Sequence, residues 1–429
     1  MKTVIMAGGK GTRIASIASG IPKPMIPLHG KPILQYQIEC LARNKLTDIV
    51  ISIGYLGHTI KEFFGDGKKF GCSISYYEEA EPLGTGGALF KILDELEYDF
   101  ILINCDIIFD LDFSRLIEFH RNSSAWATLA VHPNNHPYDS ALIFTDEDNR
   151  VIKWLNKEDD RLYYKNQVNS GIHILSKNLL RLVQVQQEKV DLDREILKPL
   201  IQSGKIFAYS TPEYIKDAGT PERYTEVSHD IETGLVQQKN LSCRQKAVFL
   251  DRDGTINIAN SFITKPGNFE LIPGAGEAIG HINRLGYLAI VITNQPVIAR
   301  GDCSIEDLEL IHQKMESDLG RSGAYIDALF YCPHHPDKGF KGERAEYKID
   351  CNCRKPKPGM LLAAAKKYNI DLSCSYMVGD SMNDVGAGIA AGCIPVLLSE
   401  NAEEGKILEK GIIVKLCSNL KEFTETCLF

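Results

Sequence analysis

Short apolar runs rich in valine and isoleucine alternate along this chain with longer amphipathic stretches, and the runs end in Gly, Asp or Asn. This alternation is typical of strands that lead into helices in sheets flanked by helical layers. It begins again at residue 247, where a new apolar run leads into a turn with two acidic residues. The sequence therefore predicts the α/β class twice, once in each half of the chain.

The expected strands form two sets, separated by a polar stretch at residues 232–244. At 429 residues the chain exceeds one compact core, because domains usually contain roughly 100 to 200 residues. We therefore expect a first domain at residues 1–235, a linker at 236–245 and a second domain at 246–429. The first set of strands comprises residues 3–6, 48–53, 73–77, 100–103 and 127–131, and the second set comprises residues 247–250, 288–292, 328–331, 376–378 and 395–398.

Charge and cysteine content limit the partners that we expect. The formal net charge is −8, which disfavours binding to nucleic acid or to an anionic membrane surface. The longest apolar runs are far shorter than the roughly 20 residues that span a bilayer. The 12 cysteines are scattered along a chain that opens on a strand-like segment without a leader pattern, which indicates a reducing cytoplasm rather than a disulfide framework. We expect small-molecule partners, and any phosphate must be bound locally.

A glycine-rich loop, AGGKGTR at residues 7–13, follows the first expected strand. Its glycines allow backbone N–H groups to approach a phosphate chain, and Lys10 and Arg13 supply positive charge. The loop alone is equally consistent with a plain tight turn. In the segment IPKPM at residues 21–25, two prolines fix the backbone around Lys23 and hold its charge in a defined place, although a solvated surface lysine is the simpler reading of that residue alone.

Two aspartates of the first half are candidate metal ligands. Asp106 follows the expected strand at residues 100–103, at the sheet edge where ligands gather in α/β folds. Asp217 lies in the segment IKDAGTP at residues 215–221. If the fold brings them together, the two carboxylates suit a Mg²⁺ ion, which would neutralise charge during displacement at phosphorus. Either aspartate alone is more often a cap or turn residue.

The glycine-rich loop, the IPKPM segment and the two aspartate segments resemble the sugar-1-phosphate nucleotidyltransferase family. The resemblance also includes EPLGTGGA at residues 81–88 and VNSG at residues 168–171, and all of these segments occur in the order typical of the family. The resemblance implies a Rossmann-like fold with a GT-A-like mixed sheet. It also implies that a sugar 1-phosphate oxygen attacks the α-phosphorus of a nucleoside triphosphate and releases pyrophosphate. Lys23 and Arg13 would be catalytic, and Asp106 and Asp217 would bind Mg²⁺. The residues that would bind nucleotide and substrate are Gly8, Gly9, Gly11, Thr12, Gly84, Thr85, Gly86, Gly87, Asn169 and Gly171.

In the second half, the apolar strand at residues 247–250 ends in the turn DRDGT at residues 251–255. Residues two apart on a strand point the same way, so Asp251 and Asp253 can face one site. Burying two like charges is costly unless a cation joins them, which favours a Mg²⁺ site over a purely structural role. Further polar groups follow later along the chain, namely Thr293 and Asn294, Arg354 and Lys355, and Asp380 and Asp384.

These residues resemble the four motifs of haloacid-dehalogenase-type (HAD) phosphatases, which implies a HAD-like Rossmannoid parallel sheet in the second half. By this resemblance Asp251 attacks phosphorus to form an aspartyl phosphate, and Asp253 protonates the leaving oxygen and then activates water. Thr293 and Lys355 would hold the transferring phosphoryl oxygens. The Mg²⁺ ligands would be Asp251, Asp253 and Asp380.

Two short clips in the second half carry metal-binding side chains, CPH at residues 332–334 and CNC at residues 351–353. Three thiolates and one imidazole suit tetrahedral Zn²⁺, although free cysteines beside a loop histidine are the simpler alternative. His335 could compete with its neighbour, but the family resemblance favours His334. A site with four protein ligands has no open position, so the zinc would be structural and would hold the loop that carries Arg354 and Lys355. The expected zinc ligands are Cys332, His334, Cys351 and Cys353.

The second half is similar to the heptose 1,7-bisphosphate phosphatases among the HAD phosphatases. The similarity lies in the two short metal-binding segments, the turn DRDGTIN and the segment IARG at residues 298–301. Histidinol-phosphate phosphatases share the metal-binding segments and are the nearest alternative family. Asn294, Arg300 and Arg354 would then bind substrate. The first half resembles heptose 1-phosphate guanylyltransferases. The fusion implies two consecutive steps: removal of the 7-phosphate from D-glycero-D-manno-heptose 1,7-bisphosphate, then transfer of GMP from GTP to the heptose 1-phosphate.

Three other readings stay open on the sequence alone. The same two chemistries could act on a mannose-type or amino-sugar phosphate with GTP, UTP or CTP. The first half could be a non-catalytic ligand-sensing module, although a sensor has no need of the metal pair Asp106 and Asp217. A phosphatase acting on nucleic-acid ends is disfavoured by the net charge and by the lack of a basic stripe.

Overall fold

The computed structural model describes residues 1–9, 20–183, 188–259, 261–399, 406–409 and 411–428. Contacts between Cα atoms group the chain into two compact units. The first unit comprises Met1–His132, Ile143–Trp154 and Val168–Asn240, and the second comprises Pro133–Leu142, Leu155–Gln167 and Leu241–Phe429. Within the described residues, no helix combines the length and the apolar character needed to cross a membrane.

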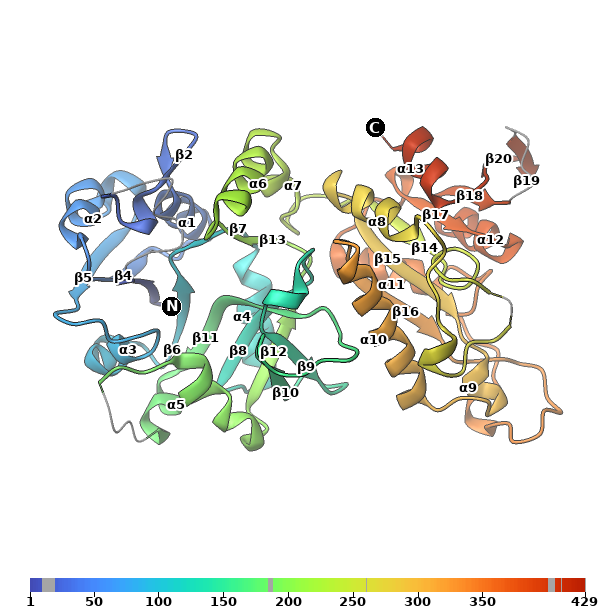
Figure 1. The fold of residues 1–429 in the computed structure, drawn as a ribbon, viewed down its shortest axis with the longest axis horizontal. Coiled ribbons are helices and arrows are strands. Elements are labelled where there is room, and N and C mark those ends of the chain that lie inside the picture. The colour runs from blue at the N-terminus through green and yellow to red at the C-terminus, as the bar shows by residue number, and fades with distance from the viewer. Residues whose placement is uncertain (10–19, 184–187, 260, 400–405, 410, 429) are drawn as a thin grey trace. The chain divides into compact units, whose positions relative to one another are not determined.

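A mixed sheet runs through the first unit (Figure 1). Its described strands lie in the order β10 (Val151–Leu155), β9 (Leu142–Thr145), β11 (Val168–Ser176), β6 (Asp99–Asn104), β1 (Thr3–Ala7), β4 (Asp48–Ile53) and β5 (Ser73–Glu78), and β11 also pairs with β8 (Ala127–His132), which pairs with β12 (Ile206–Ser210). β1 is parallel to β4 and β6, whereas β11 is antiparallel to β6. The mixed sheet expected for the first half is confirmed.

Helices cover this sheet through their apolar faces. The buried side chains of α1 (Ile33–Arg43), α2 (Gly57–Phe64) and α4 (Phe113–Ser123) pack in one hydrophobic cluster with those of β1, β4 and β6. The helical period places Leu34, Ile38 and Leu41 on one face of α1, and these three residues are fully buried. The remaining described α-helices of the unit are α3 (Gly87–Lys91), α5 (Lys177–Leu182), α6 (Pro221–Glu232) and α7 (Leu235–Gln238).

A two-stranded ladder joins two distant parts of the first unit. β7 (Ile107–Asp110) pairs antiparallel with β13 (Tyr214–Asp217), and the register sets Asp217 opposite the first residue of β7. Because Asp106 immediately precedes β7, the ladder brings Asp106 and Asp217 close together although they are far apart in the sequence. A second small ladder joins β2 (Pro27–Leu28) and β3 (Lys31–Pro32).

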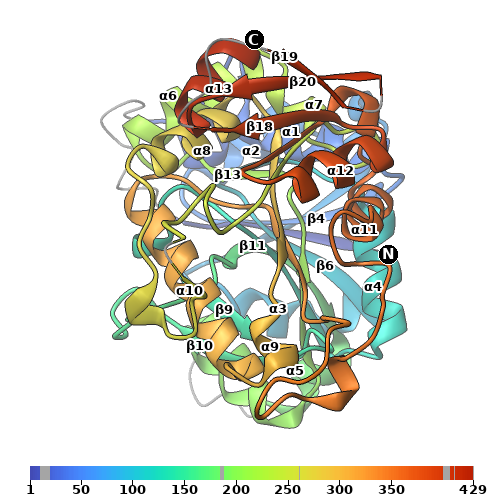
Figure 2. The same ribbon diagram turned by 90° about the vertical axis from the view of Figure 1, so that its right-hand side faces the viewer.

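The sheet of the second unit is parallel except at one edge (Figure 2). Its described strands lie in the order β16 (Ala328–Cys332), β15 (Leu288–Asn294), β14 (Ala247–Leu250), β17 (Tyr376–Gly379), β18 (Ile394–Leu398), β20 (Ile412–Cys417) and β19 (Lys406–Glu409). β19 runs antiparallel to β20, and the other neighbouring strands are parallel. The α/β class and the parallel sheet expected for the second half are confirmed.

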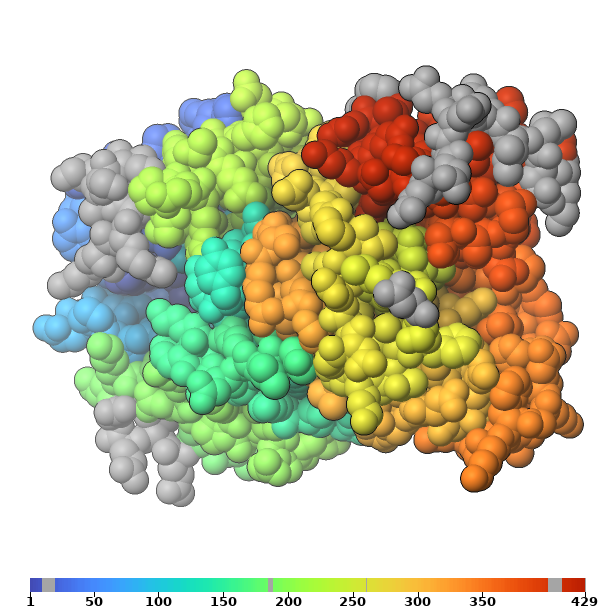
Figure 3. All heavy atoms as spheres, turned by 45° about the vertical axis from the view of Figure 1, so that its right-hand side comes forward, coloured from blue at the N-terminus to red at the C-terminus, as the bar shows by residue number. Residues whose placement is uncertain are grey.

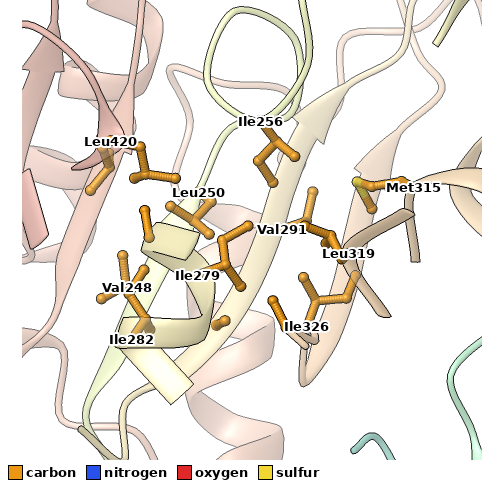
Figure 4. Packing of buried hydrophobic residues seen from close by; sticks show 14 of the residues in the cluster. Val248, Leu250, Ile256, Ile279, Ile282, Val291, Met315, Leu319, Ile326 and Leu420 are labelled. Atoms are coloured by element: carbon orange, nitrogen blue, oxygen red, sulfur yellow. The ribbon is translucent and has the colours of Figure 1, made fainter. Parts of the chain in front are cut away.

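Alternate residues of the central strand β14 enter two different cores. Val248 and Leu250 belong to one hydrophobic cluster, part of which is drawn in Figure 4, and Ala247 and Phe249 belong to another. Because successive side chains of a strand alternate between faces, a strand covered by helices on both sides must be apolar throughout. The first cluster receives side chains from the helices α8 (Ala275–Arg284), α9 (Val297–Arg300), α10 (Ile305–Arg321) and α13 (Leu420–Cys427). The second receives them from α11 (Gly359–Tyr368) and α12 (Met382–Ala391).

Each strand expected from the sequence is present, and its ends differ from the expected ones by no more than two residues. The strands that the sequence analysis did not identify are β2, β3, β7, β9, β10, β11, β12, β13, β19 and β20.

Leu361 and Leu362 are neighbours on α11 that are 0% and 47% exposed, respectively. We expect Leu361→Ala to lower the free energy of unfolding of the second unit by about 2–5 kcal/mol, because it removes apolar contacts and leaves a cavity. Leu362→Ala is the matched control and should change it by less than about 0.5 kcal/mol. Urea unfolding followed by circular dichroism measures both variants, and losses of equal size would contradict the observed packing.

Candidate active sites and metal cluster

Strand ends bring three carboxylates of the second unit together. Asp251 follows β14 and Asp380 follows the neighbouring β17, and the backbone N–H of Asp251 donates to the carbonyl oxygen of Val378 (2.9 Å). Asp384 lies in the first turn of α12, where its carboxylate accepts from the backbone N–H of Ser381 (3.1 Å). One oxygen from each of Asp251, Asp380 and Asp384 lies within 4.8 Å of the other two. This spacing and this all-oxygen donor set suit a Mg²⁺ ion.

A buried lysine contacts two of these carboxylates. The Nζ atom of Lys355 lies 2.8 Å from Oδ1 of Asp251 and 2.5 Å from Oδ1 of Asp384, and the lysine side chain is 2% exposed. Burial raises the pKa of Asp251 to about 7, against the opposing effect of the Lys355 ammonium. Burial alone would lower the pKa of Lys355, but the two carboxylates raise it above its usual value. The site therefore holds an ammonium group and carboxylates in direct contact.

Residues at the end of β15 fix the position of Lys355. The Nδ2 atom of Asn294 donates to the carbonyl oxygen of Lys355 (3.1 Å), and its Oδ1 accepts from the backbone N–H of the same residue (3.0 Å). Lys355 Nζ also donates to the carbonyl oxygen of Ile292 (2.8 Å). Thr293 is 1% exposed, and its Oγ1 accepts from Nε2 of Gln295 (2.9 Å). The structure thus brings Thr293, Asn294 and Lys355 to the same strand end.

The Asp253 carboxylate is hydrogen-bonded to side chains other than Lys355. Its carboxylate accepts from Nη2 of Arg252 (2.9 Å to Oδ2), from Nε2 of Gln295 (2.8 Å) and from Nδ2 of Asn257 (3.1 Å). Sequence reasoning missed these three partners. A usable signal was present only for Arg252, because a cationic residue between two acids that are expected to face one site is itself a candidate for pairing.

Two arginines expected to bind substrate are held in different ways. Nη1 of Arg354 donates to the carbonyl oxygen of His334 (3.2 Å). The guanidinium carbon of Arg300 lies 4.8 Å from the ring centre of Phe262 and 4.3 Å from that of Phe340. Phe262 is 52% exposed and belongs to the loop after β14, which lies at the surface of the second unit (yellow in Figure 3). Stacking between two aromatic faces therefore orients the Arg300 side chain.

Four side chains from two loops form a compact cluster that could hold a metal ion. The Sγ atom of Cys332 lies 3.5 Å from that of Cys351, and the Sγ atom of Cys353 lies 3.2 Å from each of them. Nδ1 of His334 lies 3.3 Å from Sγ of Cys353 and 3.7 Å from Sγ of Cys332. Tetrahedral zinc with its usual bond lengths separates neighbouring ligand atoms by roughly 3.3 to 3.8 Å. His335 is not part of this group, and its Nδ1 accepts a backbone hydrogen bond instead.

In the first unit, each of the two candidate metal ligands is paired with a cation. Nζ of Lys23 lies 2.5 Å from Oδ2 of Asp106. Nη1 of Arg223 donates to both carboxylate oxygens of Asp217 (3.0 and 2.8 Å). A Cβ atom on Gly219 would lie 2.9 Å from Oδ1 of Asp217 and 3.2 Å from Nζ of Lys23. The structure therefore brings Lys23, Asp106 and Asp217 together around one glycine.

The structure describes only the start of the expected phosphate loop. Gly8 and Gly9 follow β1, whereas Gly11, Thr12 and Arg13 lie outside the described residues. A Cβ atom on Gly8 would overlap the carboxylate of Glu79, whose Oε1 accepts from the Ser52 hydroxyl (2.7 Å). A side chain at position 8 would therefore have to displace the Glu79 carboxylate.

The glycines at residues 84–87 pack against another stretch of backbone. Gly84 has a φ of +78°, and a Cβ atom there would overlap the carbonyl oxygen of Val190. A Cβ atom on Gly87 would overlap the carbonyl oxygen of Glu188. The backbone N–H of Leu192 donates to Oγ1 of Thr85 (2.9 Å). These contacts give the small residues a packing role, and their part in substrate binding stays a prediction.

The segment VNSG contacts a buried acid that sequence reasoning missed. Nδ2 of Asn169 donates to Oδ2 of Asp193 (3.1 Å). Burial raises the pKa of Asp193 to about 7, and the neighbouring Asp191 adds to this effect. Gly171, with a φ of +78°, lies against the side chain of Asn104. No sequence signal pointed to Asp193, because the fold alone brings it to Asn169.

Family comparisons match both halves of the chain. The nucleotidyl transferase family model matches residues 2–234, and the HAD-hydrolase-like family model matches residues 352–422. A mannose-1-phosphate guanylyltransferase from Mycobacterium tuberculosis is 32% identical over 235 residues, which cover 54% of this chain and 65% of that protein. The chain therefore spans less than two thirds of the length of this relative.

Two further proteins are similar to one half of the chain each. A D-glycero-beta-D-manno-heptose-1,7-bisphosphate 7-phosphatase from Pasteurella multocida is 44% identical over 147 residues, which cover 34% of this chain and 77% of that protein. The crystal structure of HddC from Yersinia pseudotuberculosis is 28% identical and has a TM-score of 0.48, with coverage of 54% of this chain and 99% of that chain.

Gly254 and Gly274 have similar left-handed backbones, with φ values of +80° and +84°. A Cβ atom on Gly254 would overlap Oδ2 of Asp380, whereas a Cβ atom on Gly274 would have no described neighbour within 4 Å. We expect an alanine at either position to lower stability by about 1–2 kcal/mol. Only Gly254→Ala should abolish phosphate release from p-nitrophenyl phosphate, because it displaces Asp380. Full phosphate release by Gly254→Ala would contradict the observed position of Asp380.

Proposed function

Because the chain belongs to the nucleotidyl transferase family in residues 2–234 and to a phosphatase family in its second half, we propose that it catalyses two consecutive steps of nucleotide-sugar synthesis. The second unit removes the 7-phosphate of D-glycero-D-manno-heptose 1,7-bisphosphate. The first unit transfers GMP from GTP to the resulting heptose 1-phosphate, which gives GDP-heptose and pyrophosphate. The observation that carries the proposal is the buried contact of Lys355 with Asp251 and Asp384 in the half related to a heptose bisphosphate phosphatase.

The phosphatase step begins at Asp251. Its carboxylate oxygen attacks the phosphorus of the 7-phosphate and forms an aspartyl phosphate as the bond from phosphorus to the sugar oxygen breaks. Asp253 donates a proton to the departing sugar oxygen. It then takes a proton from the water that hydrolyses the aspartyl phosphate, which releases phosphate and regenerates Asp251. Lys355 and Thr293 bind the phosphoryl oxygens and stabilise their charge.

The proposed Mg²⁺ ligands of the phosphatase are Asp251, Asp380 and Asp384, whose oxygens converge. When bound, the ion would neutralise charge on the phosphate and on the carboxylates. Asp253 is expected from the sequence to be a further ligand, but it does not belong to the group of converging oxygens, and we assign it to proton transfer alone.

In the transferase step, an oxygen of the heptose 1-phosphate attacks the α-phosphorus of GTP, and the bond to pyrophosphate breaks. Lys23 and Arg13 bind phosphate, and the loop at residues 8–13 surrounds the triphosphate. Asp106 and Asp217 are the proposed Mg²⁺ ligands, and the ion pairs that they make with Lys23 and Arg223 would be exchanged for substrate and metal contacts. Residues 84–87, with Asn169 and Gly171, contact the base and the sugar.

The chemistry of the two reactions supports their order. Removal of the 7-phosphate leaves a sugar 1-phosphate, which is the nucleophile that a nucleotidyltransferase of this class requires. GTP is favoured because a relative of the first half is a guanylyltransferase.

Mass spectrometry of the reaction products tests both steps. The full-length protein is incubated with the α and β anomers of heptose 1,7-bisphosphate and with GTP, UTP or CTP in turn. We expect GDP-heptose from one anomer with GTP. Asp251→Asn should stop phosphate release but still convert supplied heptose 1-phosphate, and Asp106→Asn should show the reverse.

The possible outcomes separate the two halves of the proposal. Phosphate release without a nucleotide sugar would support the phosphatase and refute the sugar or the base assigned to the transferase. Loss of both activities from either single substitution would contradict two independent sites.

We assign the cluster of Cys332, His334, Cys351 and Cys353 to a structural Zn²⁺ ion. Three thiolates and one imidazole at these separations suit tetrahedral zinc. Thiolate ligands persist in a reducing compartment, so we propose that the enzyme works in the cytoplasm. Cys353 lies two residues before Lys355, and the bound ion would therefore hold the segment that carries the catalytic lysine.

Purified full-length protein should contain about one zinc ion per chain, as measured by inductively coupled plasma mass spectrometry. Cys353→Ser should lower the zinc content and the release of phosphate from p-nitrophenyl phosphate, because the Lys355 segment loses its anchor. The exposed Cys374 lies outside the cluster, so Cys374→Ser is the matched control and should retain both. Full phosphatase activity in a zinc-free protein would refute the assignment.

A further inference from the structure

A buried arginine stands between the two aspartates of the proposed phosphatase reaction. Arg252 is 0% exposed, and a buried charge is unfavourable unless it is paired and hydrogen-bonded. Its Nη2 donates to Oδ1 and Oδ2 of Asp253 (3.0 and 2.9 Å), and its Nε lies 3.3 Å from Oδ1 of the same residue. The guanidinium therefore contacts both oxygens of the proposed proton donor.

Gln295 adds a second contact to the same carboxylate. Nη2 of Arg252 donates to Oε1 of Gln295 (3.1 Å), and this bond fixes the orientation of the amide because arginine has only donors. The amide nitrogen of Gln295 then donates to Oδ2 of Asp253 (2.8 Å) and to Oγ1 of Thr293 (2.9 Å). Gln295 is 2% exposed and follows β15, so it links Asp253 to a different strand end.

His312 contacts the other terminal nitrogen of Arg252. Its Nε2 lies 3.3 Å from Nη1 of Arg252, and it must accept this hydrogen bond because arginine only donates. The ring is therefore neutral and carries its proton on Nδ1. Burial lowers the pKa of His312 well below its usual value, and the charges of Arg252 and Lys165 lower it further. Because His312 lies on α10, which packs in the core, the guanidinium has a rigid support.

Asn257 completes the surroundings of Asp253. Its Nδ2 donates to Oδ1 of Asp253 (3.1 Å), and the backbone N–H groups of residues 255–257 donate to the carbonyl oxygen of Arg252. Both oxygens of Asp253 are thus held by donors, from the turn after β14 and from the residue after β15.

We propose that Arg252 and Gln295 are positioning residues that orient the carboxyl group of Asp253 toward the leaving oxygen. This inference rests on the phosphatase chemistry proposed above. A proton donor accelerates a reaction only when it is aligned with the departing atom. A planar guanidinium that contacts both carboxylate oxygens fixes the plane of the carboxyl group, which a lysine ammonium does not. Without either residue, Asp253 remains present but is free to rotate.

The dependence of kcat/KM on the leaving group separates this role from general structural damage. Phenyl phosphate releases a strongly basic oxygen that needs a proton, whereas p-nitrophenyl phosphate releases a weakly basic one that does not. For both Gln295→Met and Arg252→Lys, we expect kcat/KM for phenyl phosphate to fall about 100-fold. For p-nitrophenyl phosphate, the same variants should lose less than about threefold, since Asp251 still attacks phosphorus.

Two further variants serve as references in the full-length protein. Asp253→Asn removes the proton donor and should show the same selectivity between the two esters. Gln313→Met makes the matched substitution on α10, away from these contacts, and should leave both reactions unchanged.

The outcomes distinguish this inference from the proposal on which it rests. Equal losses on both esters, or no loss on either, in Gln295→Met and Arg252→Lys would refute the positioning role. If the unaltered protein hydrolyses neither ester, the proposed phosphatase chemistry itself is wrong.

Discussion

The contact of the Lys355 ammonium with Asp251 and Asp384 is the interaction on which the rest of the proposed phosphatase site depends. Carboxylates gathered at the ends of parallel strands repel one another, and burial removes their hydration. Lys355 offsets both effects, and Asn294 fixes its backbone by two hydrogen bonds. The cluster of Cys332, His334, Cys351 and Cys353, which could hold a metal ion, ends two residues before this lysine. The buried Lys355 ammonium thus contacts the carboxylates, while its backbone is bound to the end of β15 and follows the cysteine–histidine cluster in the chain.

The first unit arranges its charges differently. The side chains of Asp106 and Asp217 are 26% and 29% exposed, whereas that of Asp384 is fully buried. Partly exposed ion pairs exchange their partners at a lower cost than buried ones, because water replaces part of the lost contact. In the proposed transferase, these carboxylates would therefore release Lys23 and Arg223 for a large charged substrate, whereas Asp384 is held in place by Lys355.

Much of the fold could be predicted from the sequence, because a strand covered on both faces must be apolar throughout, as β14 is. The strands β7 and β13 escaped prediction, because their pairing depends on contacts between segments that are distant in the chain. The same reason hid Asp193, which becomes notable only beside Asn169. Residues 133–142 and 155–167 group with the second unit, and no local pattern indicated this.

By itself the sequence determined two α/β sheets, the carboxylates at their strand ends and the three cysteines of the candidate metal cluster, because these features follow from local periodicity and from spacing along the chain. The choice of His334 over His335 rested on the family resemblance. Only the tertiary structure decided which charged side chains pair with one another. It sets Lys355 between Asp251 and Asp384, and it surrounds Asp253 with Arg252 and Gln295. A buried charge pairs with the groups that the fold brings within hydrogen-bonding distance. Those groups can be far apart in the sequence, so the pairing cannot be read from spacing along the chain.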